Sequence, residues 1–115
     1  MALSNAALEA AASAIAALGS WCSLHTADPS TTGASEKTAV ARVQTTWTAG
    51  ASDGVNTGSA VTFNAVPADT YKGQGVWNQQ TVSGSTFVGG KSFPDLVLSA
   101  PANVTLTPRI AVTSA

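Results

Sequence analysis

The sequence predicts an all-β fold, a small antiparallel β-sandwich of about eight short strands with one N-terminal α-helix. Three observations lead to this prediction. Short extended runs recur roughly every 8–12 residues. Turn-forming residues separate these runs, with 10 Gly and 5 Pro among 115 residues. At the N-terminus, in contrast to the rest of the chain, the apolar residues follow helical spacing. We therefore divide the chain into a helix over residues 1–19 and a β-sandwich domain over residues 20–115.

The predicted helix has a narrow apolar stripe, formed by Leu8, Ala11, Ala12, Ile15 and Leu18. Ser4 or Asn5 can cap its start, and Gly19 suits the position that follows its end. A helix of about 14 residues is marginal in water by itself. We therefore expect Leu8 and Ile15 to hold it against the β domain or against a neighbouring subunit.

The first predicted strand covers residues 20–26 and alternates between two faces. Trp21, Ser23 and His25 lie on one face, and Cys22 and Leu24 lie on the other. Further strands are predicted over residues 39–47, 60–66, 75–80, 85–88, 95–99, 104–107 and 109–113.

Turns are predicted between these strands. Asp28 and Pro29 favour a turn over residues 27–30, because Asp can accept from backbone two residues later and Pro fixes φ. Residues 31–37 continue as a loop, and residues 50–58 are predicted as a long turn. Ser83-Gly84 is predicted to turn the chain, and residues 89–92 to form a hairpin loop.

The charge is low for a chain of this length. Five Lys/Arg stand against six Asp/Glu, and charged residues make up 10% of the chain, against about 25% in ordinary domains. This balance argues against nucleic acid and against an anionic membrane surface as partners. No run of about 20 apolar residues predicts a transmembrane helix. With 13 Ser, 15 Thr and 22 Ala, the weakly charged surface favours association with copies of itself.

No metal site, cofactor site or catalytic centre is predicted. Cys22 is the only cysteine and His25 the only histidine. In a strand they point to opposite faces, which works against shared metal binding or a Cys-His pair. There is no G-x-S-x-G motif. The Gly89–Ser92 stretch ends like a phosphate loop, but Ser85 stands where that motif needs its first Gly. We therefore expect no enzyme activity.

Two groups of residues could recognise a partner or fix the fold. Arg42 shares a strand face with Val40, and a guanidinium there needs an acid or backbone carbonyls. Asp28 or Glu36 could serve, so that Arg42 pins the loop to the sheet. The seven aromatic residues are interpreted mainly as core, and an exposed aromatic row that binds sugar is the alternative.

Several motifs resemble a family of short minor tail proteins from long-tailed bacteriophages, especially those of actinobacterial hosts. These motifs are Leu24-His25-Thr26-Ala27-Asp28-Pro29, Thr32-Gly33-Ala34-Ser35-Glu36, Ala41-Arg42, Val61-Thr62-Phe63 and Gly75-Val76-Trp77-Asn78. The likeness covers about residues 20–113. It departs from the family at Lys37-Thr38, where Gly-Gly is usual, and at Val40, where Tyr is usual.

The resemblance implies a structural virion protein of the tail or tail tip, made in the host cytoplasm and without enzyme activity. Its partners would be copies of itself and other virion proteins. Leu8, Ile15, Asp28, Glu36, Arg42 and Trp77 are the candidate structural and interaction residues. Two alternatives stay open: a decoration protein on the capsid, and a tail module that binds glycan on the host surface.

Overall fold

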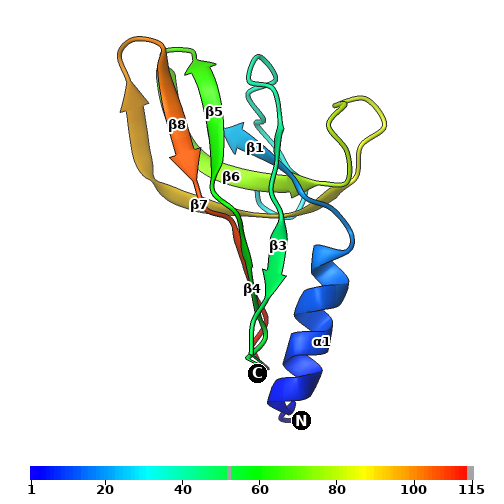
Figure 1. Ribbon diagram of the computed structural model, residues 1–115. Helices are drawn as coiled ribbons and strands as arrows, with labels where there is room; N and C mark the ends of the chain where they lie inside the picture. The colour runs from blue at the N-terminus through cyan, green and yellow to red at the C-terminus, as the bar shows by residue number, and fades with distance from the viewer. Residues whose placement is uncertain (52, 114–115) are drawn as a thin grey trace.

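The computed structural model describes residues 1–51 and 53–113, and within them the chain forms one helix and nine strands (Figure 1). The elements are α1 (Asn5–Ala16), β1 (Trp21–His25), β2 (Val43–Gln44), β3 (Trp47–Ala49), β4 (Val55–Gly58), β5 (Val61–Val66), β6 (Asp69–Trp77), β7 (Phe87–Leu98), β8 (Ala102–Leu106) and β9 (Arg109–Ala111). The predicted fold class is confirmed: the chain is mostly β, its sheets are antiparallel and sandwich-like, and one helix precedes them.

The strands form three antiparallel sheets. Sheet A has four strands in the order β2-β1-β6-β7; β3-β4-β9 form a second sheet, and β5-β8 a two-stranded ribbon. β5 follows directly on β4, and β9 on β8, so the two pairs make one long ribbon that packs on sheet A at one end (Figure 1). The other end runs away from sheet A beside β3 and α1. We call α1, β3, β4 and β9 the stem.

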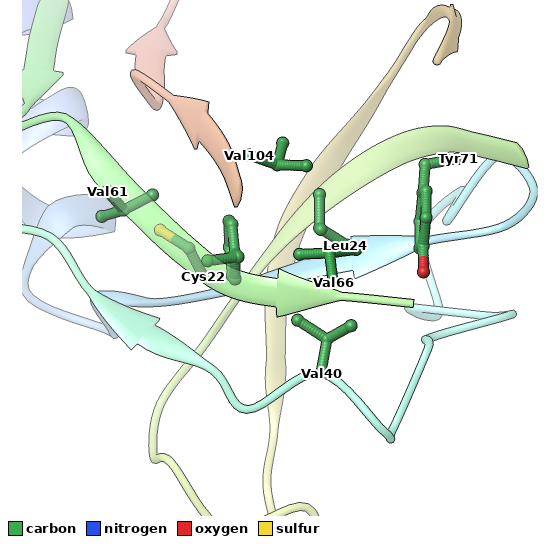
Figure 2. Close-up of a cluster of buried hydrophobic side chains, with 8 residues drawn as sticks. Cys22, Leu24, Val40, Val61, Val66, Tyr71 and Val104 are labelled. Atoms are coloured by element: carbon green, nitrogen blue, oxygen red, sulfur yellow. The ribbon is translucent and has the colours of Figure 1, made fainter. Parts of the chain in front are cut away.

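The main apolar core lies between sheet A and the β5-β8 ribbon. Figure 2 shows its side chains, which are Cys22, Leu24, Val40, Val61, Phe63, Val66, Tyr71 and Val104. The alternation predicted for the first strand is confirmed, because Cys22 and Leu24 face this core. We call this face of sheet A the inner face. The Tyr71 hydroxyl is buried with its ring and donates to the Pro67 carbonyl at 2.9 Å.

The helix is shorter than predicted and packs on its own chain, against β3, β4 and β9. Ser4 rather than Asn5 caps its start, with Oγ accepting from the Ala7 amide at 3.2 Å. Ala17 is the C-cap, so Gly19 is not the C′ residue. A Cβ on Gly19 would meet the Trp77 carbonyl at 2.4 Å, so glycine is needed there for close approach to β6.

The predicted strand over residues 39–47 is wrong, because the chain changes sheets within it. β2 belongs to sheet A, whereas β3 belongs to the stem. Thr45 is buried at the point where the chain passes from one sheet to the other. Its amide donates to the Ser20 carbonyl, and its hydroxyl donates to the Ser59 carbonyl. A tertiary contact therefore ends an alternation that would otherwise continue.

The long turn predicted over residues 50–58 is also wrong in its second half, where β4 forms. Its polar, glycine-rich sequence is stabilised by the helix, since the Gly54 amide donates to the Glu9 carboxylate at 3.0 Å. Residue 52 lies outside the described residues, as do residues 114–115 at the end of the predicted β domain.

The hairpin loop predicted over residues 89–92 does not form, and the two short strands beside it are one strand, β7. Pro94 is tolerated because β7 is an edge strand. Other boundaries shift too: β6 covers residues 69–77 rather than 75–80, β8 starts at residue 102, and β9 ends at residue 111. The turn at Ser83-Gly84 is present, with Gly84 at φ 76°.

Candidate functional site

The segment over residues 26–37 folds back against the face of sheet A opposite the core. We call this segment the strap and this face the outer face. The strap returns to β1 through Thr26 N–H donating to the Ser35 carbonyl at 3.0 Å and Lys37 N–H donating to the Leu24 carbonyl at 2.9 Å. Its first turn is closed by Ser30 N–H donating to Asp28 Oδ1 at 2.9 Å. The resemblance motif of the sequence therefore forms a fixed layer.

Arg42 fastens the end of the strap. Its Nε and Nη2 donate to the two carboxylate oxygens of Glu36 at 2.9 and 2.7 Å, a bidentate pair. The side chains are only 1% and 7% exposed. Of the two acids predicted as partners, Glu36 is the one that binds, whereas Asp28 stays at the far turn of the strap.

The remaining contacts of Arg42 reach across the sheet. Nη1 donates to the carbonyls of Gln79 and Thr81 at 3.0 and 3.3 Å. The guanidinium also lies 4.1 Å from the centre of a Trp77 ring, within cation–π range. Arg42 thus joins the strap to β6 and to the chain that follows β6.

Trp77 belongs to a buried hydrogen-bond chain on the outer face. Its Nε1–H donates to Ser23 Oγ at 2.9 Å, and Ser23 Oγ lies 2.7 Å from His25 Nε2. His25 Nδ1 lies 2.7 Å from the Ala34 carbonyl. A carbonyl can only accept, so Nδ1 carries a proton, and in the neutral ring Nε2 accepts from the Ser23 hydroxyl. Burial lowers the pKa of His25, which favours this neutral form.

Glycines make room for the strap and for His25 on the outer face. A Cβ on Gly75 would meet His25 Nε2 at 2.7 Å, and one on Gly90 would meet the Pro29 ring at 2.7 Å. Gly33 has φ +74°, and a Cβ there would meet the Trp77 ring at 2.6 Å. The Trp77 and Phe87 rings pack edge to face, with centres 4.9 Å apart. Sheet A is thus packed on both faces.

The Ser23–His25 pair has the distance of a nucleophile and its base, yet it is closed to substrate. The two residues are 1% and 0% exposed, and the second imidazole nitrogen binds a carbonyl where a catalytic triad places a carboxylate. Cys22 lies on the other face, and burial raises the pKa of its thiol to about 12. These contacts serve packing.

The other predicted residues lie in the stem or on the surface. Leu8 is buried where α1 packs on Gly54, and Ile15 is half-buried. The sequence analysis missed the roles of Ser23, Gly33 and Lys37. Lys37 pairs with Asp69 at 2.8 Å, and this contact lowers the pKa of the Asp69 carboxyl. In the sequence, only the alternation that places Ser23 on one face with Trp21 and His25 indicates that the outer face of sheet A is also buried.

No group of three or more His, Cys, Asp or Glu side chains suited to a metal ion occurs among residues 1–51 and 53–113. In the same part of the chain, no helix is both long and apolar enough to cross a membrane. Comparison with protein-family models, with curated proteins and with solved structures finds no match.

Acid should destabilise the protein through its single histidine. Burial lowers the pKa of His25 below 6.5; the Ala34 hydrogen bond and Glu36 raise it, and Arg42 lowers it further. The unfolded chain then binds a proton more readily than the folded chain below pH 6.5. As the pH falls below 6.5, we expect the free energy of unfolding to decrease by up to about 1.4 kcal/mol per pH unit. The decrease should level off once the pH is below the pKa of His25 in the folded chain.

Urea unfolding between pH 8 and pH 5 at constant ionic strength measures this slope. The matched control is His25→Gln, which keeps a polar side chain and removes the titration. An equal slope in the variant would show that His25 does not cause it.

Proposed function

We propose that the protein is a structural component of a bacteriophage tail, a minor tail protein that works through contacts between subunits. The observation that carries the proposal is the use of the motif residues. Glu36 and Arg42, which carry the resemblance to tail proteins, form a buried ion pair that fastens the strap to sheet A. Gly33 of the same motif packs on the Trp77 ring. The motif builds a rigid surface and presents no reactive group.

The shape of the molecule supports the proposal. The stem extends from sheet A (Figure 1), and the chain measures 46 × 29 × 23 Å along its principal axes. Strands β7, β8 and β9 are terminal in their sheets, and unpaired strand edges are ready surfaces for another chain. The Trp77 ring is covered by Arg42 and packed against Phe87, which disfavours it as a sugar platform.

Locating the protein in purified virions tests the proposal. Immunogold labelling with an antibody against this chain should mark the tail or tail tip. Gold over the head would favour a capsid decoration protein, and binding of the purified protein to a glycan array would favour the host-glycan alternative. Absence of the chain from virions, by mass spectrometry, would reject the proposal.

The stem should be required for assembly. Leu8→Asp with Ile15→Asp places two carboxylates against the stem strands, where Leu8 is only 9% exposed. We expect the double variant to be lost from particles, because a buried unpaired charge is strongly destabilising. The measurement is the amount of the chain in virions from complemented infection. Ala10→Asp with Ala14→Asp, on the exposed face of the same helix, should be incorporated normally.

A further inference from the structure

A groove separates the inner face of sheet A from the stem. Its volume is about 570 Å³, and it is lined by β6 and β7 on one side and by α1, β3 and β9 on the other. Its apolar lining includes Ile15, Trp47, Val76, Val88 and Ile110. Such an open, partly apolar surface suits a polypeptide partner.

The edge of β7 is accessible where it borders the groove. At residues 93–95 a register shift and Pro94 protect the edge. At Gly89 and Gly90 the strand carries no side chain, and a Cβ on Gly89 would meet nothing within 4 Å. Another chain can therefore approach the backbone at this end of β7.

The groove holds the two basic side chains that have no acidic partner in the part of the chain that the structure describes. Lys37, Arg42 and Lys72 pair with acids, whereas Lys91 and Arg109 have no acidic partner within residues 1–51 and 53–113. Both line the groove. Lys91 lies opposite Gln74, which lies opposite Leu24, so its side chain is on the inner face. The groove therefore favours an acidic group, in a chain whose net charge is −1.

The chain itself carries a matching acid on its opposite side. Glu9 is engaged inside the stem, and Asp53 lies beside β4 in the stem that forms one wall of the groove. Asp28 is exposed on the strap, on the outer face of sheet A, and one of its oxygens is held by the Ser30 amide. Because Asp28 and the groove lie on opposite sides of sheet A, an Asp28 that enters a groove comes from another subunit.

We propose that the groove binds the strap turn of a second copy of this chain, with Asp28 of one subunit between Lys91 and Arg109 of the next. The two surfaces differ, so the contact is head-to-tail and repeats into a ring or a filament. This inference rests on the proposed function, since it names the subunit contact by which the protein would assemble.

Sedimentation velocity of the purified chain tests the contact. The wild type should grow in mass with concentration, and less so at high salt, because exposed charges are screened. Asp28→Lys alone, and Lys91→Glu with Arg109→Glu, should each associate at least tenfold more weakly. Mixed in equal amounts, the two variants have complementary charges at both contacts, and association should return. Asp53→Lys and Lys72→Glu are the matched controls and should associate like the wild type.

Circular dichroism melts verify that each variant is folded, and Asp28→Asn with Lys91→Gln and Arg109→Gln provide milder versions if a reversal unfolds the chain. A wild type that stays monomeric, or a mixture that does not associate, overturns the inference. Loss of association in Asp53→Lys but not in Asp28→Lys overturns it too. A monomeric chain found in virion tails would reject this contact alone, whereas a self-associating chain missing from virions would reject the proposed function alone.

Discussion

Replacing Arg42 by Ala should lower the free energy of unfolding by about 3–5 kcal/mol, because the change leaves the Glu36 carboxylate buried without its partner. A partly buried charged hydrogen bond contributes less, about 1.5–3 kcal/mol. The near-complete burial of both side chains raises the expected loss. The variant also frees the carbonyls of Gln79 and Thr81 and uncovers the Trp77 ring.

Arg42→Lys should recover only part of this stability, because an ammonium lacks the planar fork that meets both Glu36 oxygens. Urea unfolding of the wild type and both variants measures the difference. Arg109→Ala is the control, since it removes an exposed arginine with no acidic partner among the described residues. Equal midpoints for the wild type, Arg42→Ala and Arg42→Lys would mean that Arg42 does not fasten the strap.

Replacing Gly33 by Ala should cost about 2–5 kcal/mol, from two separate causes. A left-handed backbone at a residue with a Cβ costs about 1–2 kcal/mol. The new methyl group would also press on the rings of Trp77 and Phe87, at 2.6 and 2.8 Å, and overpacking costs about 1–3 kcal/mol. The strap would have to lift from the sheet to accommodate it.

Gly84→Ala separates the two causes. Gly84 has φ +76°, almost the same as Gly33, but a Cβ there would meet nothing within 4 Å. This control should therefore show the backbone cost alone. Loss of near-ultraviolet dichroism from Trp77 should accompany Gly33→Ala only. Identical losses of stability in the two variants would remove the packing of the strap on the rings as a cause.

The fold class could be predicted from the sequence because it depends on local patterns. Alternation put Cys22 and Leu24 on the core face, and helical spacing placed α1 near its observed bounds. The errors arise where distant contacts override local signals. Gly89-Gly90 reads as a break, yet β7 continues through it because Gly90 faces Pro29 of the strap. Asn56 favours a turn by its residue type, yet it lies in β4, which packs against the helix.

The candidate site was only partly predictable for the same reason. Arg42 stood out because a charged residue on an apolar alternation needs a partner, and Glu36 was near enough in the chain to be considered. The choice between Glu36 and Asp28 depends on how the strap folds back, which no local pattern encodes. Ser23 and Gly33 serve as contacts for Trp77, more than 40 residues later in the chain, and neither residue type draws attention alone.

The position of β1 at the centre of sheet A has a consequence for how the protein folds. Its neighbour β6 lies far along the chain, since Trp21 pairs with Trp77. Nothing can close over the outer face until that distant strand arrives, because the strap packs on Trp77. Folding dominated by such non-local pairing is slow, typically milliseconds to seconds. During synthesis, the side of β1 that carries Ser23 and His25 therefore stays exposed to solvent until the ribosome has released most of the chain.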